Sequence, residues 1–166
     1  VGSEMCIRDR AMKENDILAY IQPVFVDLDM NTVEPAIGTH RMEGIYAWKT
    51  MLDLGIHASG GSDAPVVSFD AMENIYFAVT RKNINGEPKE GWIPSERLTV
   101  DEAVKLFTKY AAYASYTEDE NGTIETGKNA DFVVLEKDLY EIDPDEIKTT
   151  KVDMTILGGE TVFERK

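Results

Sequence analysis

The stretch Leu52–Val66, LDLGIHASGGSDAPV, predicts the end of a helix, a short strand and a polar turn in immediate succession. Gly55 is a natural C-terminal stop for a helix that we expect over residues 42–54. Residues 56–61 are mostly small and apolar, which favours a buried strand. Asp63 then follows at the end of this strand. A Gly-Ser-Asp triplet on its own indicates no more than a turn in which the aspartate bonds its own backbone.

A second strand candidate lies upstream of this stretch. Residues 19–26, AYIQPVFV, are rich in β-branched and aromatic side chains and predict a buried strand. Pro23 cannot donate to a ladder, so it marks the end of this strand or a bulge. Residues 27–41 indicate a polar loop, and a helix over 69–80, capped by Ser68, follows the later strand. The order strand, helix, strand, helix is typical of a parallel α/β sheet or barrel.

The C-terminal part of the sequence has a different pattern. Thr99–Glu102, TVDE, forms a capping box that opens an amphipathic helix ending at Ala114. Gly158–Gly159 predicts a tight hairpin between two strands. Beyond residue 115 the chain is β-rich, and we expect a short turn at 143–147 and strands over 131–135, 152–157 and 161–163.

Two parallel strands with their helices can neither close a barrel nor cover both faces of a sheet. They would also leave open strand edges, which proteins avoid. We therefore expect the sequence to be the C-terminal part of a larger α/β protein. Residues 1–10, VGSEMCIRDR, resemble read-through of a sequencing adaptor and have neither a start methionine nor the apolar core of a signal peptide. We leave them out of the fold, and a short disordered tail is the alternative.

Composition excludes several classes of function. The sequence has 31 acidic and 17 basic side chains and a formal net charge of -14, which disfavours nucleic-acid partners and anionic membranes. Hydrophobic residues make up 43%, the balance of a soluble globular protein, and no apolar run approaches the ~20 residues of a membrane helix. Cys6 is the single cysteine, so no internal disulfide can form and a reducing, cytoplasmic location is expected.

Collinear motifs resemble the amidohydrolase superfamily of metal-dependent hydrolases. Leu52–Val66 resembles the eighth strand of the family's barrel, and Leu98–Ala114 (LTVDEAVKLFTKYAAYA) resembles the helix that follows the barrel. Gly122–Leu135 (GTIETGKNADFVVL) is similar to the return into a small β-sandwich domain. Tyr20–Pro23 (YIQP) and Arg41–Trp48 (RMEGIYAW) resemble the amidohydrolase-3 branch, which includes N-substituted formamide deformylase.

The resemblance implies both a fold and a chemistry. The fold is the last strands and helices of a (β/α)8 TIM barrel over 11–118, followed by part of a composite β-sandwich over 119–166. The chemistry is hydrolysis of non-peptide carbon–nitrogen bonds, in amides or formamides, by metal-activated water. The family holds one or two divalent ions, usually zinc, and its aspartate at the end of the eighth strand corresponds to Asp63. Asp63 is then a metal ligand and a catalytic proton shuttle in preference to a turn residue.

The histidines depart from the family pattern. The sequence has only His40 and His57 and no His-x-His pair, whereas zinc needs three or four protein ligands. His57 lies six residues before Asp63, about 20 Å along a strand, so it belongs to the core and not to the same ion. The other metal ligands are therefore expected outside this sequence. These 166 residues alone should neither retain the metal nor turn over substrate.

Four polar residues are candidates for substrate contact, each with a structural alternative. Gln22 ends the first strand and can bond substrate or be a satisfied amide at the barrel rim. Arg41 can pair with a substrate carboxylate or with the start of a helix, and His40 can touch substrate or be a solvated loop histidine. Ser62 can orient Asp63 or cap the turn. The expected partner is a small-molecule amide, and association into a homo-oligomer is left open.

Two alternatives to an amide hydrolase remain. A truncated or decayed module, which only associates, predicts no metal and no turnover even when the missing part is supplied. A ring deaminase of the same superfamily would use the same metal-bound water.

Overall fold

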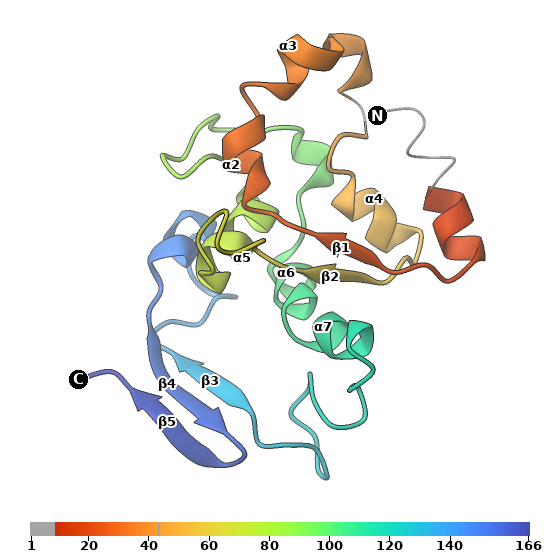
Figure 1. Ribbon diagram of the computed structural model, residues 1–166. Helices are drawn as coiled ribbons and strands as arrows, with labels where there is room; N and C mark the ends of the chain where they lie inside the picture. Colours follow the sequence, from red (N-terminus) through yellow and green to blue (C-terminus); the bar gives the residue numbers. More distant parts are fainter. Residues whose placement is uncertain (1–8, 43) are drawn as a thin grey trace.

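The computed structural model describes residues 9–42 and 44–166, and within them the strands form two sheets (Figure 1). In the first sheet, β1 (Ala19–Ile21) runs parallel to β2 (Ala58–Gly60). Ala19 lies opposite Ala58, and Ile21 lies opposite Gly60. The parallel order confirms the predicted strand–helix–strand unit, because parallel neighbours need a crossover between them.

The crossover from β1 to β2 contains more helix than we predicted. It consists of α2 (Phe25–Asp29), α3 (Val33–Ile37), the 3-10 turn η1 (Thr39–Arg41) and α4 (Trp48–Asp53). The prediction of a polar loop over 27–41 is therefore wrong, and so is the prediction that the first strand extends to residue 26. The apolar run that follows Ile21 is used by α2 and not by a strand.

Backbone partners explain why β1 ends early. Pro23 has no N–H to give to a ladder. The N–H of Val24 donates to the side-chain oxygen of the buried Asn74 (3.1 Å) and not to a strand. The N–H of Phe25 then donates to the carbonyl of Gln22 (3.2 Å), which begins the helical turn. Pro23 therefore marks the end of the strand, as predicted, and Asn74 holds the turn that follows.

The helix predicted over 42–54 is confirmed only for its second half, α4. Gly44 and Tyr46 have φ angles of 85° and 49°, which an α-helix does not accommodate. The predicted stop is correct, because Leu54 caps α4 and Gly55 follows with a φ of 74°.

The apolar α5 (Ala71–Thr80) is the most deeply buried helix among the described residues, with residues 74–80 all buried. Its N-cap is Asp70, whose carboxylate accepts from the N–H of Met72 (2.8 Å), so the prediction that Ser68 caps the helix is wrong. Ser68 instead accepts from the N–H of Asp70 (3.2 Å). Asp70 occupies this position because its carboxylate suits the positive end of the helix dipole.

The single amphipathic helix predicted after Thr99 is divided into α6 (Val100–Leu106) and α7 (Lys109–Ala114). The break places the ring of Phe107 against Gly60 in β2, where an added Cβ atom would lie 2.6 Å from the ring. α7 then lies along β2: the Tyr113 ring stacks on His57 at 4.2 Å, and the Tyr20 hydroxyl donates to the Ala114 carbonyl (3.1 Å).

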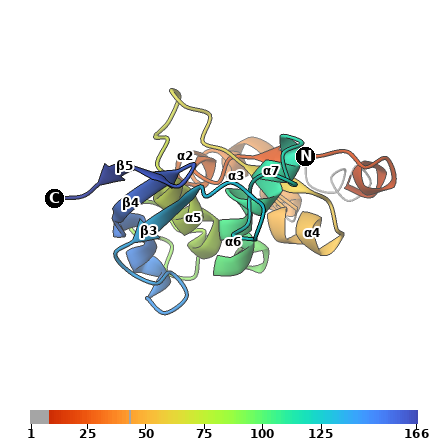
Figure 2. The same ribbon diagram turned by 90° about the horizontal axis from the view of Figure 1, so that it is seen from below.

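The second sheet is antiparallel, in the order β3 (Phe132–Leu135), β4 (Val152–Leu157), β5 (Glu160–Glu164). Gly158 and Gly159, with φ angles of 59° and 82°, form the predicted hairpin. Besides η1, the described residues contain the 3-10 turns η2 (Pro94–Glu96) and η3 (Pro144–Thr149). η3 confirms the predicted turn and packs on α5. Figures 1 and 2 show this sheet on one side of the helices, away from β1.

Residues 1–8, which include Cys6, lie outside the described residues. Residues 9–14 are helical, and Asp9 is 1% exposed. Desolvation, reinforced by the negative charge of Glu96, raises the pKa of Asp9. The exclusion of residues 1–10, and the boundary near residue 118, stay predictions. Across the described ranges, no helix is both long enough and apolar enough to cross a bilayer.

The capping box of α6 gives a stability prediction. The Thr99 hydroxyl accepts from the Glu102 N–H (3.2 Å), and the Glu102 carboxylate accepts from the Thr99 N–H (2.8 Å). Thr99→Ala should lower the free energy of unfolding by about 1 kcal/mol in urea titrations at neutral pH. Thr126→Ala, at an exposed threonine outside any helix, is the control, and an equal loss there would contradict the assignment.

The same box should make stability depend on pH. Partial burial would raise the pKa of Glu102, but hydrogen bonds from Thr99 and Lys49 outweigh it and lower that pKa below its ordinary value. The carboxylate therefore contributes stability above the unfolded-state pKa, and this contribution is lost as the pH falls through the folded-state pKa. The difference between Thr99→Ala and the parent chain should shrink in acid.

Candidate active site

The carboxyl ends of the two parallel strands bring three of the predicted polar residues, Gln22, Ser62 and Asp63, to one edge. Gln22 follows β1, and the Gly61-Ser62-Asp63 turn follows β2. The N–H of Gly61 donates to the carbonyl of Ile21 (2.9 Å), so the pairing continues one step beyond the strands. Ligand sites in parallel α/β folds lie at this end of the strands.

Asp63 lies in a left-handed turn with its side chain exposed. Its φ is 62°, a region that aspartate tolerates better than most residues. The turn is closed by the backbone, since the Asp63 carbonyl accepts from the N–H of Val66 (3.0 Å). The backbone therefore holds the turn, and Asp63 is an exposed residue just beyond the carboxyl end of β2. Ser62, just before it, is half-buried.

The Asp63 carboxylate could serve as one ligand of a metal site. A carboxylate oxygen is a suitable ligand for a divalent ion, but an ion of the zinc type needs three or four protein ligands. Over residues 9–42 and 44–166, no three His, Cys, Asp or Glu side chains gather closely enough to hold a metal. Asp63 can thus supply a single ligand, and its role as metal ligand stays a prediction.

The two histidines have different surroundings. His57 is half-buried and its ring stacks on Tyr113, which agrees with the packing role predicted for it. The prediction that one strand runs from His57 to Asp63 is wrong, because β2 spans only Ala58–Gly60. His40 and Arg41 are exposed in η1, beyond α3, which Figure 1 shows at an extremity of the ribbon. No described contact brings either of them to Asp63, and their binding of substrate stays a prediction.

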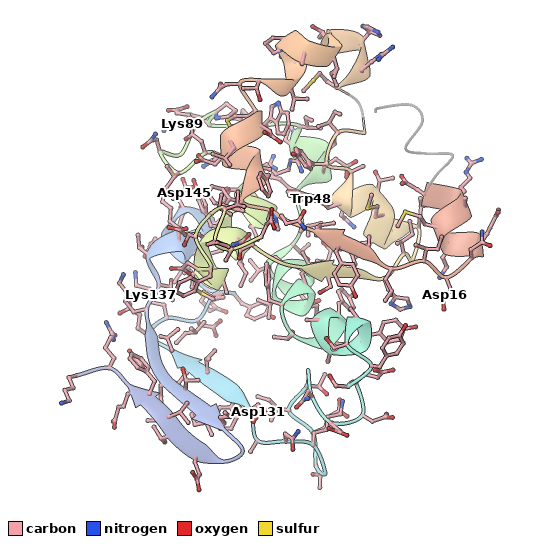
Figure 3. The ribbon with its side chains drawn as sticks, viewed as in Figure 1. Asp16, Trp48, Lys89, Asp131, Lys137 and Asp145 are labelled. Atoms are coloured by element: carbon pink, nitrogen blue, oxygen red, sulfur yellow. The ribbon has the colours of Figure 1, made fainter. Side chains whose placement is uncertain are left out.

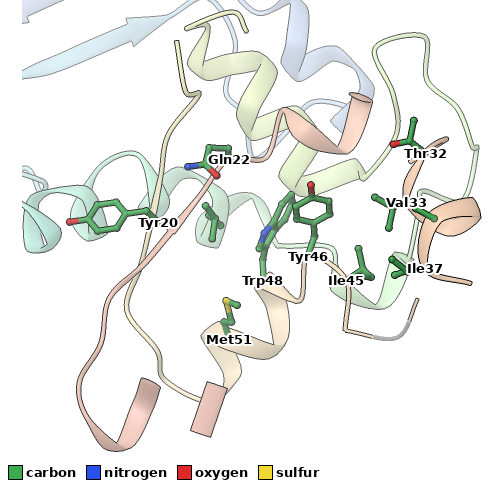
Figure 4. A pocket seen from close by; sticks show the side chains of 11 residues that line it. Tyr20, Gln22, Thr32, Val33, Ile37, Ile45, Tyr46, Trp48 and Met51 are labelled. Atoms are coloured by element: carbon green, nitrogen blue, oxygen red, sulfur yellow. The ribbon is translucent and has the colours of Figure 1, made fainter. Parts of the chain in front are cut away.

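A pocket of about 530 Å³ lies beside Gln22, between β1, α3 and α4 (Figure 4). This volume is in the range of small-molecule sites. Its walls are mainly apolar, with Gln22, Thr32 and two tyrosines as the polar groups. The lining residues are Tyr20, Ile21, Gln22, Thr32, Val33, Ala36, Ile37, Ile45, Tyr46, Trp48 and Met51. The pocket was not predicted, because its walls come from segments that are separated in the sequence.

Tyr46 and Arg81 hold the wall of this pocket. The Tyr46 hydroxyl donates to the carboxylate of Asp29 on α2, and burial together with this carboxylate raises the pKa of Tyr46. Arg81, at the end of α5, is fully buried and donates to three backbone carbonyls. Burial lowers the pKa of Arg81 to about 10, against the opposing effect of Glu96, so it stays charged at neutral pH. No sequence pattern had marked this arginine. Figure 3 shows Trp48, which stacks on it, in the interior of the ribbon.

Comparison with known proteins gives a consistent result. The sequence profile of the amidohydrolase family matches residues 10–163. The chain is 38% identical over 145 residues to YtcJ of Bacillus subtilis, covering 87% of this chain and 27% of that protein. It is 34% identical over 121 residues to N-substituted formamide deformylase of Arthrobacter pascens, covering 73% of this chain and 22% of that enzyme. The chain thus spans about a quarter of the length of these curated relatives.

The fold is also found among solved structures. An uncharacterized metal-dependent hydrolase from Pyrococcus horikoshii superposes with a TM-score of 0.73 at 20% identity, over 82% of this chain and 28% of that one. At this identity the likeness concerns the fold alone.

The contact between β2 and Phe107 predicts a difference between neighbouring glycines. Gly60→Ala should lower the free energy of unfolding by about 1 to 3 kcal/mol, because its methyl group would overlap the Phe107 ring. Gly61→Ala is the matched control, since an added Cβ there meets nothing within 4 Å. Urea unfolding of both variants measures the difference. Equal stabilities would show that Phe107 does not pack against β2 in solution.

Proposed function

The chain belongs to the amidohydrolase family, and we propose that it supplies one metal ligand and the proton-transferring carboxylate, both from Asp63, to a hydrolase that cleaves non-peptide carbon–nitrogen bonds. The observation that carries the proposal is the exposed Asp63 carboxylate at the carboxyl edge of β2, which the backbone-closed turn leaves free for chemistry.

Asp63 has a defined part in this reaction. A divalent ion, zinc in our proposal, would be held in part by Asp63 and would supply activation of the attacking water and polarisation of the scissile carbonyl. Asp63 accepts a proton from the attacking water as the oxygen adds to the carbonyl carbon. It then passes that proton to the nitrogen as the carbon–nitrogen bond breaks, so the carboxylate is regenerated. The products are a carboxylic acid and an amine.

The substrate class is a small amide or formamide. The name of the Arthrobacter pascens relative, N-substituted formamide deformylase, supports this class. Gln22 is the best placed of the proposed substrate contacts, because it lies at the carboxyl edge and also lines the apolar pocket. We also propose Ser62, His40 and Arg41 as substrate contacts. Ser62 shares the turn with Asp63, whereas His40 and Arg41 lie in η1.

We further propose that residues 11–118 form the last strands of a TIM barrel and that 119–166 form part of a β-sandwich. The paired β1 and β2 support the first part, since other strands of a barrel would cover their outer edges. The C-terminal sheet supports the second, because Val133, Val162 and Phe163 expose about half of their surface. The remaining metal ligands would then come from polypeptide that the longer relatives possess.

The test uses an extended protein in which residues 11–166 replace the matching part of Bacillus subtilis YtcJ. Asp63→Asn should lower kcat/KM for a formamide or amide by about a thousand-fold, because proton transfer is lost. Asp70→Asn is the matched control in the same exposed loop and should leave kcat/KM unchanged, since asparagine caps a helix as well as aspartate does.

Three outcomes would count against the proposal. Undiminished turnover in Asp63→Asn would remove Asp63 from the mechanism. Hydrolysis by the 166-residue chain alone, abolished by Asp63→Asn, would show that no further ligands are needed. An extended protein that folds but binds no metal and hydrolyses nothing would favour a module that only associates.

A further inference from the structure

Arg81 joins three segments that are distant in sequence. Its Nε donates to the Trp92 carbonyl (2.6 Å), its Nη1 to the Tyr46 carbonyl (3.0 Å) and its Nη2 to the Ile45 carbonyl (3.4 Å). The guanidinium lies 4.8 Å from the centre of the Trp48 ring and 5.5 Å from that of Trp92. Only a planar group with several donors can make this set of contacts at once.

The backbone around Arg81 is strained. Arg81, Tyr46 and Ile93 have φ angles of 53°, 49° and 53°, a region that costs a non-glycine residue about 1 to 3 kcal/mol. Such conformations persist where surrounding contacts enforce them. The Arg81 carbonyl also accepts from the Trp92 N–H (2.6 Å), so the two residues bond to each other in both directions.

Two of the three held carbonyls, those of Ile45 and Tyr46, belong to residues in the wall of the pocket beside Gln22. Ile45, Tyr46 and Trp48 all line that pocket. The Tyr46 carbonyl accepts from the Trp48 N–H (2.8 Å) as well as from Arg81, and the Tyr46 hydroxyl holds Asp29 on α2. α2 connects Gln22 to α3, and Gln22 and α3 both contribute lining residues, although α2 itself does not.

We infer that Arg81 is a positioning residue that fixes the Ile45–Trp48 wall of the pocket and, through that wall, the site where substrate meets Gln22. The effect of Arg81 on substrate binding rests on the proposed function. The effect of Arg81 on the structure of the pocket wall does not depend on any catalysis. A buried arginine that only stabilised the fold would have no preferred effect on this wall.

The first test measures amide hydrogen exchange by NMR in the full 166-residue chain. In Arg81→Met, the Trp48 amide should exchange at least about tenfold faster than in the parent chain, relative to the Thr155 amide in β4. Arg81→Lys should give a similar change, because a point charge cannot bridge three carbonyls. Arg97→Met is the matched control, since Arg97 is exposed and outside this network.

The second test measures kinetics in the extended protein. Arg81→Lys should raise KM about tenfold with little change in kcat, because the wall and not the proton shuttle is disturbed. Equal acceleration of the Trp48 and Thr155 amides, or an unchanged KM in an active variant, would overturn the inference. An extended protein with no turnover at all would defeat the proposed function alone, and the exchange ratio would still decide the role of Arg81.

Discussion

The parallel register between β1 and β2 is the constraint on which the rest of the structure depends. Ile21 opposite Gly60 brings Gln22 and the Asp63 turn to the same edge, because parallel strands end on the same side of their sheet. A shift by one residue would exchange the buried and exposed faces of either strand. The alternation of buried Ala19 and Ile21 with exposed Tyr20 fixes the register from the core side.

Aromatic and charged groups cooperate in holding this edge. Gly60 admits the Phe107 ring on the core side of β2, and Arg81 ties the pocket wall to α5 from the interior. A buried guanidinium is costly to desolvate, and its retention requires several hydrogen bonds and stacking contacts together. The three carbonyls and two indole rings around Arg81 meet that requirement, which is why the group remains charged in an otherwise apolar region.

Local signals in the sequence predicted the elements that local chemistry determines. The Thr99–Glu102 capping box and the Gly158–Gly159 hairpin are both set by neighbouring residues, and both were predicted. Pro23 indicated where β1 ends, but the hydrogen bond from Val24 to Asn74 and the contact of Phe107 with Gly60 were not predicted, because their partners are distant in sequence. The apolar pattern shows that residues are buried, but it does not show which partner buries them.

In the candidate site too, one residue could be predicted from local sequence and another could not. Asp63 could be found because strand, turn and acidic residue are consecutive in the sequence, and family resemblance gave the carboxylate a role. Arg81 could not, because a single arginine after an apolar helix gives no indication of three carbonyls contributed by residues 11 and 35 to 36 positions away. A residue that reacts can carry a local motif, whereas a residue that positions others is defined by its contacts. In this chain the exposed carboxylate and the buried guanidinium are therefore complementary in the proposed site: Asp63 would carry the chemistry, and the network around Arg81 would position the wall of the neighbouring pocket.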